Sequence, residues 1–348
     1  MTIETAMTPM DEETDIPREN GESTTVESTD DLPAPYGGYR VSASHYEPAR
    51  VPQEVSRFAG DPESLRVGSP GKVGVLQLTF SRNDRGTELT KHYQKSPLQI
   101  MRPLYFDPLR PDMPYTMLMT AGGGLVSGDR HRTDVICGPD SAAHLTTQAF
   151  TKVYRMEIGY AAATTNLTIE AGAFVEFLPD PVIPFADSRY YQRTAVVLDP
   201  TATLIAGETV YAGRLARDER HVFDVYASDF EVRRPDGTIV ALDRVRLCPK
   251  DTEVNGLAVL GGFDVLAMLY VLTPLIAATE LADRLHSALS EAYGTDLLFG
   301  VSVLPGESGV WLRMLGNDTI LIARASALAA GFVHELLTGN PAPASRKC

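Results

Sequence analysis

Apolar and polar residues alternate in short runs along most of the chain after Gly71, and Gly, Pro and Asp residues separate the runs. Alternation with a period of two is typical of strands that bury one face, and the separating residues are those that turns prefer. Asp236-Gly237 is a strong signal for a two-residue hairpin. The predicted strand runs cover residues 72–80, 87–95, 115–121, 132–138, 143–156, 164–172, 173–179, 190–199, 202–213, 222–237 and 238–247.

The last third of the chain changes to a β-α-β-β-α pattern. Residues 263–273 form an apolar run rich in β-branched and aromatic residues, which is typical of a buried strand. A helix is predicted to begin at Thr273-Pro274 and to end at Gly294, because leucines recur between them with helical spacing. Two strand-like runs, FGVSVLP and GVWLRMLG, precede a final helix predicted from about Asn317 to Gly339.

Together these patterns predict a mainly β fold, a large irregular multi-sheet β assembly with a C-terminal β-α-β-β-α segment (two helices) packed on it. No fixed period recurs, so any solenoid character is expected to be irregular. Residues 1–65 are acidic and rich in Thr, Ser and Pro, which predicts a disordered N-terminal extension. Residues 66–255 are the predicted β-rich core, residues 256–338 the C-terminal part of the same domain, and residues 339–348 a flexible tail.

Composition and charge exclude several classes of function. The net charge of −14 argues against nucleic-acid binding, which needs a concentrated positive face. The most apolar stretch, residues 257–275, is interrupted by Gly, Asp and Pro, so we expect a buried strand and no membrane span. No basic region followed by an apolar run begins the chain, so a cytoplasmic location is expected. Cys137 and Cys248 lie in or beside apolar runs and are predicted to be small buried hydrophobes.

Enzyme signatures are incomplete wherever they begin. The glycine-rich run AGGGLVSGDR lacks the Gly-Lys-Ser/Thr of a phosphate-binding loop and the glycine spacing of a dinucleotide site. His334-Glu335 starts like a zinc-protease motif, but Thr338 stands where the second ligand is needed, so we expect ordinary helix surface there. The histidines show no paired spacing for a metal site. We therefore expect neither a catalytic site nor a tightly bound cofactor.

Five segments, in order, resemble motifs of the urease accessory protein D family, also called the H-type accessory protein. The glycine-rich loop and the strand that follows it are the most specific of them. The segments are SPLQIMRP (96–103), AGGGLVSGDR (121–130), TTQAFTKVYR (146–155), FLPDPVIPF (177–185) and GRLAR (213–217). The resemblance covers about residues 71–250, with a weaker fit onward to 338. Residues 107–114 lengthen one loop relative to the family pattern, Asp218 stands where Gly is expected, and the N-terminal extension has no obvious family counterpart.

The resemblance implies a non-catalytic chaperone and scaffold in urease maturation, with an all-β, helix-flanked fold. Members of the family work with a helical accessory protein and a GTP-hydrolysing metallochaperone. The complex docks on apo-urease, and Ni²⁺ passes to an active site whose lysine must be carbamylated. GTP hydrolysis then belongs to a partner, Ni²⁺ is in transit, and neither nucleic acid nor membrane is involved.

Matched motif positions supply candidate residues for such a path. A transient Ni²⁺ route needs oxygen and imidazole ligands that are weak enough to release the ion. The candidates are Asp129, Glu176, Asp180 and Asp187. Alternatively, Asp129 hydrogen-bonds within the turn that Gly128 opens, and Asp180 fixes a loop between two prolines.

A second group of motif residues is expected either to contact a partner or to pack within the sheets. Lys152, Tyr154 and Arg155 are expected to form a partner surface or to pack with their polar ends in solvent, and Arg214 joins them from the fifth segment. The loop glycines are expected to be structural, because glycine permits close backbone approach and positive φ. They are Gly122, Gly123, Gly124 and Gly128.

Two other functions remain open from the residues alone. One is a β-rich hydrolase that uses paired carboxylates such as Asp180 and Asp187, provided that one cleft holds both carboxyl groups. The other is a generic β-sheet interaction module that has no connection with metal.

Overall fold

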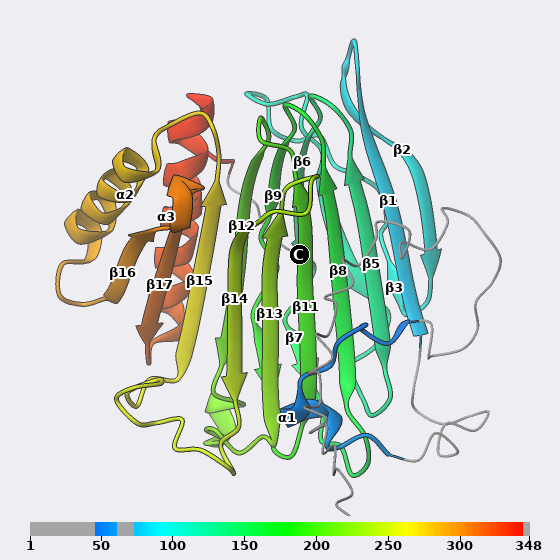
Figure 1. Cartoon of the computed structure of the whole chain (residues 1–348), viewed down its shortest axis with the longest axis vertical. Helices are drawn as coiled ribbons and strands as arrows, with labels where there is room; N and C mark the ends of the chain where they lie inside the picture. The colour runs from blue at the N-terminus through cyan, green and yellow to red at the C-terminus, as the bar shows by residue number, and fades with distance from the viewer. Residues whose placement is uncertain (1–45, 61–72, 344–348) are drawn as a thin grey trace, which may run out of the picture. The chain divides into compact units, whose positions relative to one another are not determined.

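Two β-sheets form the body of the described chain. The computed structural model describes residues 46–60 and 73–343, which all belong to the unit Gly38–Cys348. Sheet I has seven strands, in the order β14 (Ile239–Leu247), β13 (Val225–Arg233), β11 (Arg189–Leu198), β8 (Ala161–Ile169), β5 (Arg130–Cys137), β1 (Val73–Asn83) and β2 (Gly86–Lys95). Sheet I faces the viewer in Figure 1.

Sheet II has ten strands and carries the C-terminal part of the chain at one edge. Its main path is β16 (Leu298–Val303), β17 (Val310–Gly316), β15 (Val265–Leu272), β12 (Thr203–Tyr211), β9 (Phe174–Phe177), β6 (Ala142–Thr147), β4 (Tyr115–Thr120) and β3 (Leu98–Gln99). Two short strands lie off this path: β10 (Val182–Pro184) pairs with β12 and with β7 (Thr151–Val153).

The chain alternates between the sheets. Strands β4, β6, β9 and β12 of sheet II are parallel to one another, and so are β5, β8, β11 and β13 of sheet I. From β4 to β13, one or two strands of sheet II are followed each time by one strand of sheet I. The architecture is therefore an irregular β-solenoid, and the mainly β, multi-sheet prediction is confirmed.

Apolar side chains stack in register between the sheets and form the main core. Leu78, Val135, Leu167, Val196 and Val232 occupy one continuous row across five strands of sheet I, and all are buried. Side chains of sheet II, including those of β6, β9, β12 and β15, close this core from the other side. Burying each such side chain contributes about 1.5–3 kcal/mol, so these rows hold the two sheets together.

Two predicted strands end earlier than the sequence indicated. The run 143–156 is divided into β6 and β7, and the run 173–179 ends in strand conformation at Phe177. The physical reason is a change of partner, because β6 pairs with β9 whereas β7 pairs with β10. A hairpin at Asp236-Gly237 does join antiparallel β13 and β14, and Gly237 has a φ of 88°. Its loop is longer than the two residues predicted, because Arg234 N–H donates to Thr238 O and Gly237 N–H to Arg234 O.

Two long helices cover the outer face of sheet II, as expected for the C-terminal segment. Helix α2 (Ala278–Tyr293) buries Leu281, Leu285 and Leu289 against the sheet. It begins later than predicted, since the Thr273 hydroxyl bonds the Thr203 hydroxyl at 2.8 Å and caps no helix. In Figure 1, α2, α3, β16 and β17 gather beyond β15 in orange and red.

Helix α3 (Thr319–Thr338) begins where its cap is supplied. Asp318 accepts hydrogen bonds from the backbone N–H groups of Ile320 and Leu321 at 2.8 and 3.1 Å, and Gly339 ends the helix with a φ of 75°. By length and composition α3 would be apolar enough to cross a membrane, but one of its faces packs on sheet II. The most apolar stretch of the sequence, residues 257–275, contains β15, whose eight residues are all buried.

Residues 46–60 depart from the expected disordered extension. They contain the short helix α1 (Gln53–Ser56), which raises the number of helices in the described residues to three. Val55 is fully buried in a small apolar cluster on the outer face of sheet I. The rest of the predicted extension, residues 1–45 and 61–65, lies outside the described residues.

Candidate functional site

A cavity of about 240 Å³ lies between the two sheets, and four of the sequence motifs line it, the first of them through Leu98. The glycine-rich loop contributes residues 122–125, the following motif residues 147–152, and the proline-rich motif Phe177, Pro179, Asp180 and Val182. These segments are far apart in the sequence, and the solenoid brings them to one place because each belongs to a successive coil. The cavity is therefore the feature on which the motifs converge.

Polar side chains replace the apolar rows of sheet I where the sheet faces this cavity. In one row His131, Ala163, Gln192 and Ser228 are successive neighbours across the sheet. The next row contains Thr133, Thr165 and Thr194. All of these except Ser228 line the cavity. The interior of the sandwich is thus polar at one end of the parallel strands and apolar further along them.

Glu208 projects into this interior from β12 of sheet II. Its carboxylate accepts hydrogen bonds from the hydroxyls of Tyr226 at 2.9 Å and Ser228 at 2.8 Å, so it bridges the two sheets. Burial raises the pKa of Glu208, while the hydrogen bonds from Ser228, Tyr226 and Gln192 act in the opposite direction. A carboxyl group in this position is held by neutral donors and has a raised proton affinity.

His131 supplies an imidazole to the cavity wall. Burial lowers the pKa of His131 to about 4, so the ring is neutral at pH 7. Its Nε2 atom is buried and has no hydrogen-bond partner among the described residues. A neutral imidazole with a free nitrogen is a ligand that divalent transition metals accept.

A second cavity, of about 270 Å³, lies on the other side of sheet II, next to α3. The two cavities meet at a break in the sheet, where β12 stops pairing with β9 at Ala206 and resumes pairing, with β10, at Val210. Residues that line both cavities are Phe150, Pro179, Asp180, Gly207, Glu208 and Thr209. Two carboxylates, Asp180 and Glu208, therefore flank the opening.

Asp180 is the predicted metal-path residue that lies at this opening. Its Oδ2 accepts a hydrogen bond from the Thr147 hydroxyl at 3.0 Å, and its backbone N–H donates to the same hydroxyl oxygen at 2.7 Å. These bonds fix the loop between the two prolines, so the structural alternative for Asp180 holds as well. Both statements are compatible, because one carboxylate oxygen can anchor the loop while the side chain lines a cavity.

Glu176 lies elsewhere, buried between two histidines. Its two carboxylate oxygens contact Nδ1 of His144 and Nδ1 of His334, each at 2.6 Å. Burial alone would raise the pKa of Glu176, but the hydrogen bonds and charges of the two histidines outweigh it and lower the pKa to about 2. The expectation that His334 is ordinary helix surface is wrong, since only 1% of this residue is exposed and it fastens α3 to β9.

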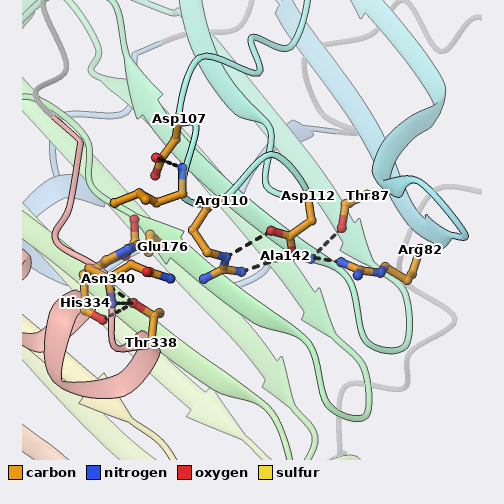
Figure 2. A network of polar contacts seen from close by, with 11 residues as sticks. Arg82, Thr87, Asp107, Arg110, Asp112, Ala142, Glu176, His334, Thr338 and Asn340 are labelled. Atoms are coloured by element: carbon orange, nitrogen blue, oxygen red, sulfur yellow. Dashed lines mark hydrogen bonds and ion pairs between the residues drawn. The ribbon is translucent and has the colours of Figure 1, made fainter.

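The loop before β4 closes over this buried cluster. The Tyr115 ring stacks on His144 with centroids 4.5 Å apart, and Phe106 packs on Tyr115 at the same distance. Figure 2 shows Arg110 of this loop between the Glu176–His334 pair and Asp112, which it meets at 3.1 Å. The lengthened segment noted in the sequence thus packs against the Glu176 cluster.

The other two predicted carboxylates have structural partners. Asp129 accepts a hydrogen bond from the Val126 backbone N–H at 2.9 Å, which closes the turn containing Gly128 (φ 79°), as the alternative reading of the sequence held. Asp187 bonds Lys250 Nζ at 2.7 Å and lies 3.6 Å from Arg155. Neither residue lines the two cavities, so Asp187 shares neither of them with Asp180.

The expected partner-surface residues gather around Phe185. Tyr154 packs edge-on against the Phe185 ring with centroids 5.1 Å apart, and the Arg214 guanidinium lies 4.2 Å from the same ring. Lys152 and Arg155 are exposed beside them on the third motif. One corner of the molecule therefore presents the third, fourth and fifth motifs together, with basic side chains at its surface.

Space requires glycine in the loop at Gly124, and Gly123 is also in close contact with a side chain. A Cβ atom at Gly124 would lie 2.5 Å from the backbone oxygen of Lys152, and one at Gly123 would lie 2.5 Å from the Tyr154 hydroxyl. At Gly122 a Cβ atom would meet nothing within 4 Å. The loop thus packs directly on β7, and Leu125 N–H donates to Lys152 O at 2.8 Å.

Sequence reasoning missed His131, Glu208, Gln192, His144 and His334. For Glu208 a signal was present, because it occupies an inward position of the alternating run that also holds Leu204, Ala206 and Val210. His131 likewise precedes inward Val135 and Cys137 with a period of two. The meeting of Glu176 with two histidines from distant elements left no sequence signal. Cys137 and Cys248 are buried, as expected.

No group of three or more His, Cys, Asp or Glu side chains that could hold a metal ion occurs within residues 46–60 and 73–343. The polar groups at the cavities are instead distributed along the walls.

Comparison with known proteins gives one consistent result. The family model described as UreD urease accessory protein matches residues 72–347. A protein named urease accessory protein UreD 2, from Streptomyces griseus, is 50% identical over 295 residues, which span 84% of this chain and 100% of that protein. Urease accessory protein UreD from Haloarcula marismortui is 38% identical over 281 residues (81% and 92%). Urease accessory protein UreD 3 from Methylorubrum populi is 35% identical over 294 residues (84% and 94%).

The close packing of the glycine loop predicts a difference between two neighbouring substitutions. Gly124→Ala should lower the free energy of unfolding by about 1–3 kcal/mol, since the added methyl group collides with the backbone of β7. Gly122→Ala is the matched control and should change the stability by less than about 0.5 kcal/mol. Urea denaturation of both variants measures this difference, and equal stabilities would contradict the packing argument.

The Glu176 cluster predicts a stability change in acid. The pKa of Glu176 falls from 4.5 to about 2 on folding, so its stabilisation is complete above pH 4.5 and is lost as the pH falls towards 2. In Glu176→Gln, the unfolding free energy should be lower at neutral pH by about 1–3 kcal/mol and should lose this part of its acid dependence. Exposed Glu170→Gln is the control. Parallel pH profiles for the wild type and Glu176→Gln in urea denaturation would contradict the prediction.

Proposed function

Because the chain belongs to the UreD urease accessory protein family, we propose that it is a non-catalytic scaffold through which Ni²⁺ reaches apo-urease. The observation that carries the proposal is the polar cavity between the sheets, which four family-like motifs line and which shares lining residues with a second cavity at the break in sheet II. The carboxylates and the imidazole of this route lie apart and would each hold an ion only briefly.

The chemistry of the walls suits an ion in transit. Asp180 and Glu208 flank the opening, and His131 offers a neutral imidazole nitrogen inside the cavity. Oxygen and imidazole donors bind Ni²⁺, whereas release is favoured when an ion meets one or two protein ligands at a time and completes its shell with water. Asp180 is retained from the sequence candidates, and Glu208 and His131 are added to it. For Glu176, Asp129 and Asp187 the contacts described above favour structural roles.

In this proposal two partners work with the chain. One is a helical accessory protein, and the other is a metallochaperone that hydrolyses GTP. The basic corner that contains Lys152, Tyr154, Arg155 and Arg214 is the proposed docking surface for one of them. The charged ends of Lys152 and Arg155 are exposed, while the Tyr154 ring and the Arg214 guanidinium, which pairs with Glu219, are fixed around Phe185. The complex then docks on apo-urease in the cytoplasm. The hydrolase alternative gains no support, since Asp180 and Asp187 line no common cavity among those described.

Reconstitution tests the scaffold role. Apo-urease, the GTPase, the helical accessory protein, GTP, bicarbonate and Ni²⁺ are combined with and without this chain, and urease activity is measured. We expect urease activity only in the mixture that contains the chain. Without the chain, the GTPase and the helical protein lack their link to apo-urease. Equal activity in its absence would end the maturation proposal.

The route of the ion is tested with variants at the opening. Asp180→Ala and Glu208→Gln should each lower the nickel content of urease several-fold, since each removes a carboxylate ligand beside the break in sheet II. Nickel is measured by elemental analysis after size-exclusion chromatography has shown that the complex still assembles. Asp236→Asn, an exposed hairpin carboxyl, is the control. Full loading by both cavity variants would remove this route while leaving the scaffold role intact.

A further inference from the structure

Residues 46–60, called the strap from here on, cross the outer face of sheet I. Helix α1 of the strap packs on β11 and β13, and Figure 1 shows it in blue across the lower ends of these strands. The strap precedes residue 72, where the match to the family model begins. It therefore lies outside the part that the family model matches, and it contacts that part closely.

An apolar anchor holds the middle of the strap. Val55 is fully buried, and its cluster contains side chains of β8, β11 and β13 together with Cys248. The partly buried Val51 and Phe58 pack against the same cluster. Of these three residues only Val55 lies in α1; Val51 precedes the helix and Phe58 follows it, so the strap contacts the cluster at three successive points. The residues that they cover are Tyr160, Ala162, Tyr191, Val225, Ala227 and Cys248.

Charged groups fix the two ends of the strap. The Glu47 carboxylate accepts hydrogen bonds from the Arg130 guanidinium and from the Tyr160 hydroxyl, and the exposed part of the Arg130 side chain is only 10%. At the other end, Arg57 pairs with Asp251, and the Arg189 guanidinium lies 4.3 Å from the Phe58 ring. The strap is thus held by an ion pair at each end, Glu47 with Arg130 and Arg57 with Asp251.

This arrangement has the features of a peptide in its binding site. A central apolar side chain fills a pocket of buried aromatic and aliphatic groups, and ion pairs at both ends set the direction of the segment. Without the strap, the sheet would expose the aromatic and aliphatic cluster around Val55 and leave the Arg130 guanidinium without Glu47. Such a face attracts other proteins.

We propose that the outer face of sheet I is a peptide-binding site, that the chain fills it with its own strap, and that the docked strap excludes other proteins from this face. A tethered segment is present at an effective concentration of about millimolar, so even a modest intrinsic affinity keeps the site filled. Partners of the chain must then bind elsewhere, unless they carry a segment that displaces the strap.

The test uses the full-length chain with a damaged strap and an intact sheet. Val55→Asp places a carboxylate in the apolar pocket and should release the strap. A fluorescent peptide with the natural sequence of residues 46–60 should then bind the variant, and fluorescence anisotropy should show at least tenfold weaker binding to the wild-type chain, whose site is already filled. A peptide that carries the same Val55→Asp change should not bind either protein.

Controls separate release of the strap from unfolding. Gln53→Asp adds the same charge at an exposed position of α1 and should behave as the wild type. Glu47→Gln combined with Phe58→Ala weakens both ends without placing a charge in the pocket, and it should also bind the peptide. Trypsin should cleave after Arg57 faster in both releasing variants, while circular dichroism shows the β structure unchanged. The proposal is overturned if neither releasing variant binds the peptide, if the wild type binds it equally well, or if cleavage after Arg57 is equally fast in all proteins.

Discussion

The two sheets share one interior, and any polar side chain that points into it must be hydrogen-bonded or neutral. Along most of the strands the constraint is met by apolar rows such as Leu78, Val135 and Leu167. At one end it is met differently, because Glu208 is held by Tyr226 and Ser228 of the opposite sheet. Leaving such a buried carboxyl without donors would cost several kcal/mol or more. The polar interior therefore depends on the register of the parallel strands, which places these donors opposite the acid.

Much of the fold follows from local pattern, and what does not follow has a physical reason. Alternation predicts the long strands well, because each buries one face against the same core. It does not predict where a strand changes partner, as at residues 148–150. The residue types there are compatible with a strand, but the backbone bends because β7 pairs with β10 whereas β6 pairs with β9. The late start of α2 is similar, because Thr273 was free to cap a helix in the sequence but bonds Thr203 in the fold.

The candidate site divides in the same way. Motif segments predicted which loops meet, and Asp180 was found at the cavity because it belongs to one of them. Composition predicts disorder for residues 46–60, because an acidic segment with few apolar residues is typical of disordered chains. The structure instead shows helix α1 there. Three apolar side chains are enough for docking when a preformed sheet supplies the rest of the pocket. The contact between Glu176 and His334 joins residues 158 positions apart, and only the packing of α3 on sheet II brings them together.

The Glu176–His334 contact connects an element that lines the outer cavity, α3, with the strand that leads to the inner one, β9. Helix α3 forms one wall of the outer cavity through Ile322, Ser326 and Ala330, and its far end is tied to β9 through His334 and Glu176. Strand β9 ends at Phe177, and the loop that follows carries Asp180 at the break in sheet II. Glu176 is thus connected by a few residues of backbone to the edge of the opening, and by a buried hydrogen bond to the helix that covers it. Glu176 lines neither cavity, yet its hydrogen bond to His334 holds together the helix and the loop that form the cavity walls.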